Sequence, residues 1–558
     1  MWVTFYLLLS GRYMRILILV FCCIPVLIFA QADFIFYNGK IFTSDRKKLW
    51  VNALAIKGQI IVQTGSDKQI LSLKQPQTKL INLDGKTVVP GFNDAHNHIG
   101  PNYPSYQVKI ANHLEDPTSW SQIEDSLRRL TKRLPAGKLI VVTINPQLLD
   151  DARIRRGLID SAAPFHPVIL KAWTGHGKIL NTAALKLTGI SRSTTFLGGW
   201  VEKDAAGEPT GLLMEYAGFG LSLKLNEKLS SQKIISDLKE SYKKFASEGI
   251  TTVQTMSEAL PAIWSQQIYS FNEFGIRVRL IPFSLTGNGE INFREWKGKF
   301  GRKNSLNSIS GLKIILDATP VERWAAVREP YSDQESNYGR LNFTIPVLKE
   351  FIQFALDNNQ QIIVHAVGDS AMQTLMNTML IMHPASWWKD KRVRIEHGDM
   401  LFEDLQDLAK EMGLVFVLNP THFSIPAIMN QRLNIERFQQ VQPMKSLLLK
   451  RIPFAFGSDG SENPFLNLMF AIIHPTNPKE AISIDEAVIA YTYGSAYAEF
   501  AENEKGTLSK GKLADLLVLS QDIFEIPPKQ LPATTPLLTM VGGKIIFNVI
   551  NKIGQKAF

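Results

Sequence analysis

Six side chains that can act as metal ligands lie where short apolar segments end, far apart in the chain. They are His96, His98, Lys313, His365, His397 and Asp459. Histidine nitrogens and carboxylate oxygens hold catalytic metal ions, which activate water and polarise a carbonyl group. Histidine-rich ligation without sulfur favours Zn2+, with Fe, Mn, Co and Ni as alternatives. The sequence therefore predicts hydrolytic chemistry at a centre of one or two divalent metal ions.

The pattern around three of these residues also fits simpler roles. His96 and His98 are two residues apart, so both imidazoles point the same way from an extended backbone. Such a pair can equally consist of two ordinary polar side chains. Asp459 lies in the segment GSDG, residues 457–460, where capping a turn is the alternative to binding a metal.

Ligands from five separate segments converge most simply at the mouth of a parallel barrel, where the strand C-termini open onto one face. Amphipathic helical stretches separate most of the eight candidate strands. These strands span 87–95, 250–256, 277–284, 311–317, 360–366, 392–397, 413–419 and 452–458. The predicted fold class is α/β, with a (β/α)8 TIM-like barrel over residues 86–499.

Two further units are predicted around this barrel. The interval after the first strand is too long for one helix and mixes strand-like with helix-like segments, so about 100–230 is expected to form an inserted α/β subdomain over the mouth. Both chain ends, 33–85 and 500–558, contain short hairpins with glycine turns. Neither end can bury a sizeable core alone, so the two are expected to form one composite β-sandwich.

The N-terminal segment is typical of export. Residues 14–32 combine Arg15, an apolar run, and small residues Ala30 and Ala32, which is the pattern of a cleavable signal peptide. Residues 1–32 are therefore predicted as a signal peptide of a periplasmic or secreted protein, with Met1 or Met14 as the start and an uncleaved anchor as the alternative. After cleavage no stable membrane insertion is expected. The only two cysteines lie in this segment, which excludes disulfides and thiolate metal sites from a processed chain.

Composition points to a globular protein without a nucleic-acid partner. The chain has 558 residues, 45% of them hydrophobic and 20% charged, enough for a large core with accessory units. Its net charge of +10 comes without a dense basic run or a groove-reading motif, so nucleic-acid binding is not expected. The sequence is compatible with a homo-oligomer.

Several motifs resemble those of one enzyme family. The segment PGFNDAHNH, residues 90–98, matches the PGFxDxHxH signature of the amidohydrolase superfamily. The motifs that follow along the chain occur in the same order as in that superfamily: HAVGDSAM, RIEHGDM, GSD and GKLADLLVL. Two further segments resemble the insert of the amidohydrolase family 3 branch, which includes YtcJ-like proteins and N-substituted formamide deformylases. They are KAWTGHGKILNTAALKLTGI and GGWVEKDAAGEPTGLLME. The resemblance covers nearly the full processed length and implies a metal-dependent (β/α)8 barrel that hydrolyses C–N bonds.

The resemblance also implies which residue does what at the metal centre. His96 and His98 would bind the more buried metal, and His365 and His397 the more exposed one. Lys313 would bridge the ions as a carbamate formed with CO2, because a free ammonium cannot bind a cation. An ion pair between Lys313 and Asp317 is the alternative.

Two further residues are assigned catalytic parts by the same resemblance. Asp459 would orient the bridging water, take its proton during attack of the metal-bound hydroxide, and deliver that proton to the leaving nitrogen. His176 would contact substrate or stabilise the oxyanion, with a surface histidine as the alternative. Glu215 is a weaker candidate of that kind, and a solvated helix face is preferred for it.

Departures from the family pattern lie after Lys313, where Arg323 and Arg328 are offered as partners for a substrate carboxylate. His422 is expected to line the pocket without a catalytic role.

Together these inferences predict an exported metal-dependent amidohydrolase that attacks a small non-peptide amide. A lactonase or phosphoesterase on the same scaffold and a catalytically dead secreted binding protein are the alternatives. The presence of all six ligand types in the required order argues against decay.

Overall fold

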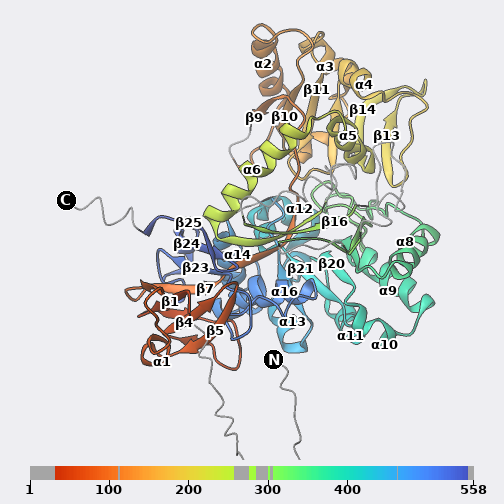
Figure 1. The fold of residues 1–558 in the computed structure, drawn as a ribbon. Coiled ribbons are helices and arrows are strands. Elements are labelled where there is room, and N and C mark those ends of the chain that lie inside the picture. The colour runs from red at the N-terminus through yellow and green to blue at the C-terminus, as the bar shows by residue number, and fades with distance from the viewer. Residues whose placement is uncertain are drawn as a thin grey trace, which may run out of the picture.

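The structure is a computed structural model that describes residues 32–110, 113–256, 275–283, 300–301, 306–460 and 463–550. The segment predicted as a signal peptide lies outside these residues, apart from Ala32. Figure 1 shows three parts: the β-sheets formed by the chain ends, a central α/β part, and an upper part that contains β9 to β14. Among the described residues, no helix combines the length and the apolar character that crossing a bilayer requires.

The central part contains two sheets of parallel strands, in the orders β8-β15-β16-β17 and β18-β19-β20-β21-β22. Most of their side chains are buried, as expected for strands covered on both faces. The strands are β8 Phe92–Asn97, β15 Ile250–Met256, β16 Arg277–Ile281, β17 Asn307–Ile309, β18 Leu312–Ile315, β19 Ile362–Ala366, β20 Arg394–His397, β21 Val415–Leu418 and β22 Phe454–Phe456. The short β17 was not predicted from the sequence.

The two sheets meet at both edges. On one side an isolated parallel bridge pairs Phe283 with Lys313. On the other, the backbone amides of Ser458 and Asp459 donate to the carbonyl of His96 at 3.1 and 3.0 Å. Neither junction is a continuous ladder within the residues described. The α/β class and the parallel arrangement are as predicted, and closure into one complete barrel stays a prediction.

Helices follow the strands of the second sheet and bury apolar side chains against it. Phe351, Leu375 and Leu405, from α8, α9 and α11, all belong to the main hydrophobic core. The helices are α8 Ile345–Asp357, α9 Asp369–Met382, α10 Ala385–Trp388, α11 Glu403–Glu411, α12 Pro426–Phe438, α13 Met444–Lys450, α14 Pro464–Ile473, α15 Ile484–Ile489 and α16 Ser495–Ala498.

The chain ends supply two more sheets, in the orders β5-β4-β1-β6 and β25-β24-β23-β7-β2-β3. Phe36 and Leu54 of the first sheet share a core with Val88, Leu516 and Met540 of the second. The strands are β1 Phe34–Tyr37, β2 Lys40–Phe42, β3 Trp50–Val51, β4 Ala53–Lys57, β5 Ile60–Gly65, β6 Lys79–Asn82, β7 Thr87–Pro90, β23 Leu516–Leu519, β24 Pro536–Val541 and β25 Lys544–Asn548, with helix α1 Asp67–Leu71.

The prediction of one strand over 87–95, and of a barrel that begins at residue 86, is wrong. β7 pairs with β2 and β23 in a terminal sheet, and the strand of the central part begins only at Phe92. Gly91 lies between the two strands, and no larger residue would fit there because a Cβ would lie 2.2 Å from Thr251 Oγ1 of β15 Ile250–Met256. Pro90 has no amide hydrogen with which to extend the ladder.

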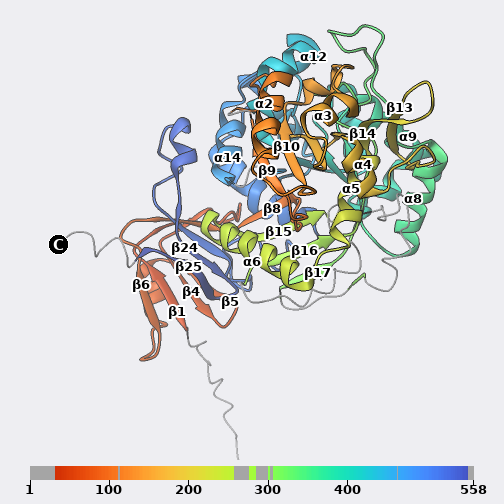
Figure 2. The ribbon, with the colours of Figure 1, turned by 90° about the horizontal axis from the view of Figure 1, so that it is seen from above.

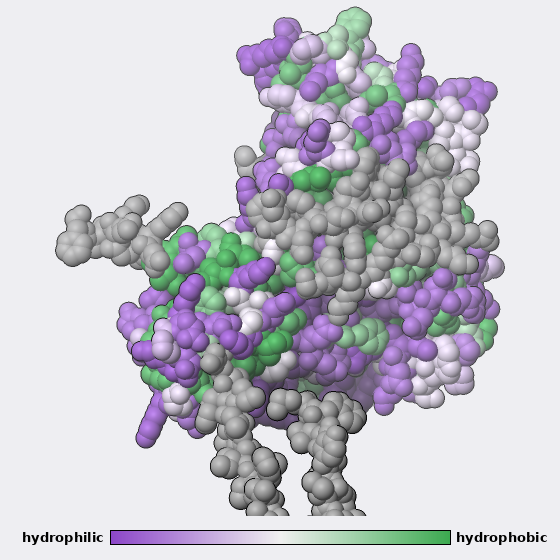
Figure 3. All heavy atoms as spheres, in the orientation of Figure 1, coloured by the Kyte–Doolittle hydropathy of each residue, from purple (hydrophilic) through white to green (hydrophobic). Residues whose placement is uncertain are grey.

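Between β8 and β15 the chain forms a six-stranded sheet of order β13-β14-β12-β11-β10-β9. Figure 2 shows this sheet and its helices in front of the central strands when the molecule is seen from above. In Figure 3 hydrophilic residues cover much of its outer surface. The elements are β9 Tyr106–Lys109, α2 Trp120–Thr131, β10 Ile140–Ile144, α3 Arg156–Ala162, β11 Val168–Ala172, β12 Gly177–Leu180, α4 Thr182–Thr188, β13 Gly199–Lys203, β14 Pro209–Glu215, α5 Tyr216–Asn226 and α6 Ser231–Glu248.

Ionic and polar contacts fix this upper part to the central one. Arg323 Nη1 contacts Asp150 Oδ2 at 2.6 Å, and the amide of Ala427 donates to Glu115 Oε1 at 2.6 Å. Residues of both parts line a cavity between them.

Candidate metal centre

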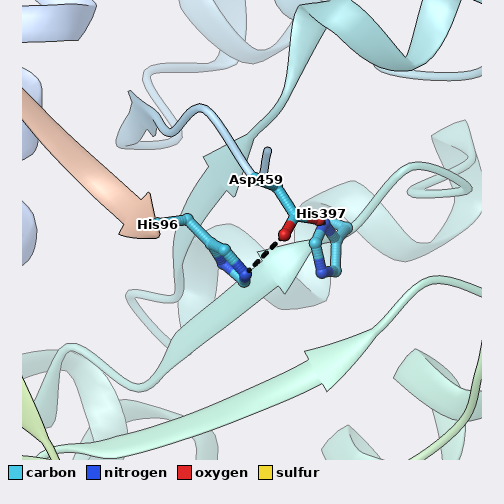
Figure 4. Close-up of side chains that lie close together, drawn as sticks. All are labelled: His96, His397 and Asp459. Atoms are coloured by element: carbon cyan, nitrogen blue, oxygen red, sulfur yellow. Dashed lines mark ion pairs between the residues drawn. The ribbon is translucent and has the colours of Figure 1, made fainter. Parts of the chain in front are cut away.

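Three of the predicted ligands point toward one another at the ends of separate strands (Figure 4). One ligand atom each from His96, His397 and Asp459 lies within 4.8 Å of the others. His96 is the fifth residue of β8, His397 ends β20, and Asp459 follows β22. Residues about 300 positions apart thus meet in one place.

His98 joins this group through His96 and Asp459. The two Nε2 atoms of His96 and His98 lie 3.0 Å apart, and Asp459 Oδ1 lies 3.5 and 3.1 Å from them. Two nitrogens on one tetrahedral zinc are separated by roughly 3.3 Å, given Zn–N bonds of about 2.0 to 2.1 Å. The spacing of these donors is therefore close to that of ligands to a common ion.

Of the other two predicted ligands, His365 adjoins the same group, and Lys313 is buried and interacts with it electrostatically. The ring centroid of His365 lies 4.4 Å from that of His397. Lys313 is 1% exposed, and its charge lowers the pKa values of His96, His365 and His397. It occupies the second position of β18, so the prediction that it ends a strand is wrong.

The electrostatics of the site favour neutral imidazoles beside an ionised carboxylate. Burial lowers the pKa of His96 to about 4 and holds the pKa values of His365 and His397 well below the ordinary value. Burial alone would raise the pKa of Asp459, but the surrounding histidines, His96 foremost, hold it well below the ordinary value. Neutral imidazoles keep a lone pair for a metal.

Close backbone contact between β8 and the β22 end brings Asp459 to His96. Asp94 accepts hydrogen bonds from the amide and the hydroxyl of Ser458 at 2.8 and 2.6 Å. Both His397 and Asp459 have positive φ, at 68° and 42°. Such conformations are unfavourable for residues other than glycine and gather at functional sites.

Gly457 permits this approach, since a Cβ there would lie 2.4 Å from the Cβ of His96. Gly457→Ala is expected to lower the free energy of unfolding by about 1 to 3 kcal/mol, the usual cost of overpacking, and to weaken metal binding. Thermal unfolding and metal titration would measure both effects. Gly157→Ala is the control, because nothing lies within 4 Å of that position. Equal metal affinity in both variants would contradict the importance of this contact.

One carboxylate and one amide that sequence reasoning missed hold the histidines. Glu396 Oε2 lies 2.5 Å from His96 Nδ1, and Asn419 Oδ1 lies 2.8 Å from His397 Nδ1. The EH pair in RIEHGD was the available signal for Glu396, but nothing in the sequence linked it to His96.

His176 lies beside this group, with its ring centroid 5.3 Å from that of His365. Its Nδ1 contacts Glu215 Oε1 at 2.8 Å. Glu215 is fully buried, so the preferred interpretation of a solvated helix face for it is wrong. The sequence offered no signal that Glu215 would meet His176.

A cavity of about 510 Å³ opens onto these residues. His176, His365, His397 and Asp459 line one part of it, and Trp173, Leu114, Ile425 and Met429 line another. His422 also lines it, as predicted, and its Nε2 lies 3.7 Å from Asp459 Oδ2 while its Nδ1 contacts Asp399 at 2.9 Å. Asp399 thus supports a neighbouring histidine.

The prediction that Arg323 and Arg328 meet a substrate carboxylate is wrong. Arg323 contacts Asp150 and Asp333 at 2.6 and 2.8 Å. Arg328 contacts Asp369 at 2.7 Å and Asp404 at 2.5 Å. Both guanidinium groups are already engaged by carboxylates of this chain.

These residues fit a divalent metal. The donors are imidazole nitrogens and one carboxylate, and those of His96, His98 and Asp459 lie 3.0 to 3.5 Å apart. His365 Nε2 is buried and has no hydrogen-bond partner among the described residues, which is unfavourable unless something else binds it.

Comparisons with known proteins agree with this chemistry. The family model described as Amidohydrolase family matches residues 79–547. YtcJ of Bacillus subtilis (strain 168) is 28% identical over 544 residues, which are 92% of this chain and 99% of that protein. An N-substituted formamide deformylase of Arthrobacter pascens is 24% identical over 542 residues, 92% of this chain and 97% of that one. The crystal structure of an uncharacterized metal-dependent hydrolase from Pyrococcus horikoshii OT3 matches with a TM-score of 0.68 at 20% identity. The match covers 89% of this chain and 99% of that hydrolase chain.

Proposed function

This chain belongs to the amidohydrolase family, hydrolases that act on carbon–nitrogen bonds, and we propose that it hydrolyses a small non-peptide amide at a divalent metal centre. The observation that supports the metal centre most strongly is the convergence of His96, His98, His397 and Asp459, of which His397 and Asp459 line the cavity. His365 and Lys313 complete the proposed ligand set. The proposal also treats the two parallel sheets as one (β/α)8 barrel, joined at Phe283 and at His96.

We propose Zn2+, as one or two ions, because the donor set is rich in imidazole and the described residues of the site include no thiolate. A metal bound here would lower the pKa of water and polarise the substrate carbonyl. We also propose that Lys313 is carboxylated. Lys313 is buried and acts electrostatically on His96, His365 and His397, and a carbamate in place of its ammonium would add an anionic oxygen donor for the metal.

The chain's own residues supply the remaining parts of the mechanism. Asp459 is ionised and lines the cavity, so it accepts a proton from the attacking water and returns it to the leaving nitrogen. His176 is fixed through Nδ1 by Glu215, which leaves its other ring nitrogen for the substrate's carbonyl oxygen. The apolar lining residues Trp173, Leu114 and Ile425 offer a surface for the apolar part of the substrate.

Substrate screening tests this function. N-substituted formamides are the first substrates to assay, because the Arthrobacter pascens relative is named as a deformylase of that class. N-acyl amino acids, lactones and phosphotriesters complete the panel. Hydrolysis of an amide that stops on chelation is the expected result, and turnover confined to lactones or phosphotriesters would contradict the proposal.

We also propose that the protein is exported. The proposal rests on the signal-like pattern of residues 14–32. Expression in a bacterial host should give a periplasmic or secreted chain that begins near Asp33, as N-terminal sequencing would show. Ala32→Leu should block this processing. A mature chain that keeps residues 14–32 would contradict cleavage and favour an anchor.

A further inference from the structure

We propose that Glu396, held by Arg394, is a positioning residue. It fixes the tautomer of His96 that has a free Nε2 for metal binding. The inference rests on the proposed function, because it concerns the same metal centre. Both side chains of the Arg394–Glu396 pair are fully buried. A buried ion pair is weak support for stability, since hydrophobic residues of similar volume often serve as well. Its place directly behind a proposed ligand therefore calls for another explanation.

The contact with His96 determines which ring nitrogen is available. Glu396 Oε2 lies 2.5 Å from His96 Nδ1, so the carboxylate accepts the Nδ1 proton. Nε2 then keeps its lone pair, and it is this atom that faces His98 and Asp459. Carboxylates that hold a metal-bound histidine in this way fix its orientation and raise its basicity.

Arg394 holds both the carboxylate and the backbone beside the ligand. Its Nε and Nη2 donate to the two oxygens of Glu396 at 2.5 and 3.0 Å. Nη2 also donates to the carbonyl of Ala95, the residue before His96. One guanidinium thus aligns the partner of His96 and the strand that carries it. Although burial would raise the pKa of Glu396, the charge of Arg394 holds it well below the ordinary value.

Gln254 fixes Arg394 in turn. Its Oε1 accepts from Arg394 Nη1 at 2.5 Å and from Arg279 Nη1 at 3.2 Å. Its Nε2 donates to Asn93 Oδ1 at 3.1 Å and to the carbonyl of Ser495 at 3.0 Å. Polar side chains therefore fill the space between the parallel strands around Gln254 and Arg394, whereas branched aliphatic residues usually fill the interior of a parallel barrel. Arg394 connects this network to Glu396 and, through it, to His96.

A second ion pair of the same type provides a matched control. Arg277 and Asp515 are 7% and 6% exposed and form two contacts, at 2.7 and 3.0 Å. Asp515 also accepts from the amide of Gly542 at 2.7 Å, where the terminal sheet adjoins β16. This pair supports structure away from the histidines.

The experiment compares Glu396→Gln with Asp515→Asn in the full-length protein. Zn2+ affinity is measured by competition with a chromophoric chelator, and the absorption spectrum of the Co2+-loaded protein reports ligand geometry. Glutamine has one oxygen where Arg394 and His96 need two acceptors, so Glu396→Gln should weaken Zn2+ binding by about 10- to 100-fold and change the Co2+ spectrum. Asp515→Asn should lower the unfolding temperature and leave both metal properties unchanged.

A double variant covers the case in which Glu396→Gln does not fold. Arg394→Met combined with Glu396→Leu removes both buried charges, so no charge is left uncompensated. This variant should fold and still show the weakened Zn2+ binding. Wild-type affinity and an unchanged Co2+ spectrum in a folded variant would overturn this inference but not the proposed function. Failure of the wild-type protein to bind any divalent metal would overturn the proposed function as well.

Discussion

Replacing Asp459 with Asn is expected to lower kcat on an amide substrate by about 1,000-fold, the middle of the range for loss of a general acid–base group. The amide keeps the size of the side chain but cannot take a proton from water or return it to the leaving nitrogen. The carboxylate also lies 3.1 Å from His98 Nε2, so metal affinity should fall with it. Steady-state kinetics at saturating metal separates the two effects.

Asp404→Asn is the matched control for this substitution. Asp404 lies in the same central part and forms an ion pair with Arg328, but its side chain is 57% exposed and outside the cavity lining. The kcat of the Asp404→Asn variant should stay within about twofold of wild type, because surface ion pairs contribute little to the stability of the fold. If a folded Asp459→Asn variant kept the wild-type rate, Asp459 would not be the proton-transfer group.

Replacing Lys313 with Met should remove most of the bound metal and lower hydrolysis by more than about 100-fold, because losing even an outer partner of a ligand costs 10- to 100-fold. Methionine keeps an unbranched side chain and cannot form a carbamate. Metal analysis of the purified variant and native mass spectrometry of the wild-type protein, which should carry the added mass of one CO2, are the measurements.

Lys178→Met is the control for this prediction. Lys178 is also buried, at 4% exposure, and donates to the carbonyl of Gly218 at 2.9 Å in the upper part of the molecule. That variant should keep its metal. A Lys313→Met protein with full metal content would contradict a role in ligation and favour an ordinary ammonium paired within the core.

Much of the candidate site could be predicted because its ligands lie in short β-rich segments. The prediction of a strand over 250–256 is confirmed by β15, and those over 360–366 and 392–397 contain β19 and β20. Hydrophobic runs mark such buried strands whatever their partners are. Parallel strands then bring their ends to one face, which explains why residues as distant as His96 and Asp459 meet.

What sequence reasoning missed depends on contacts between strands that periodicity does not encode. Glu396 alternates with its neighbours like any strand residue, and only a side-chain contact between β20 and β8, which belong to different sheets, places it behind His96. Glu215 has a positive φ of 54° at the start of α5, which turns it inward to His176. The engagement of Arg323 by Asp150 likewise depends on how the upper part docks. The division at Pro90 and Gly91 depends on the close approach of Thr251.

Anomalous diffraction from crystals grown with Zn2+ tests the central claim most directly. The account predicts a peak at the zinc edge within about 2.0 to 2.3 Å of His96 Nε2, His98 and Asp459, and loss of that peak in His96→Ala crystals. A peak located elsewhere, or none between these side chains at saturating Zn2+, would contradict the claim that they form a metal centre.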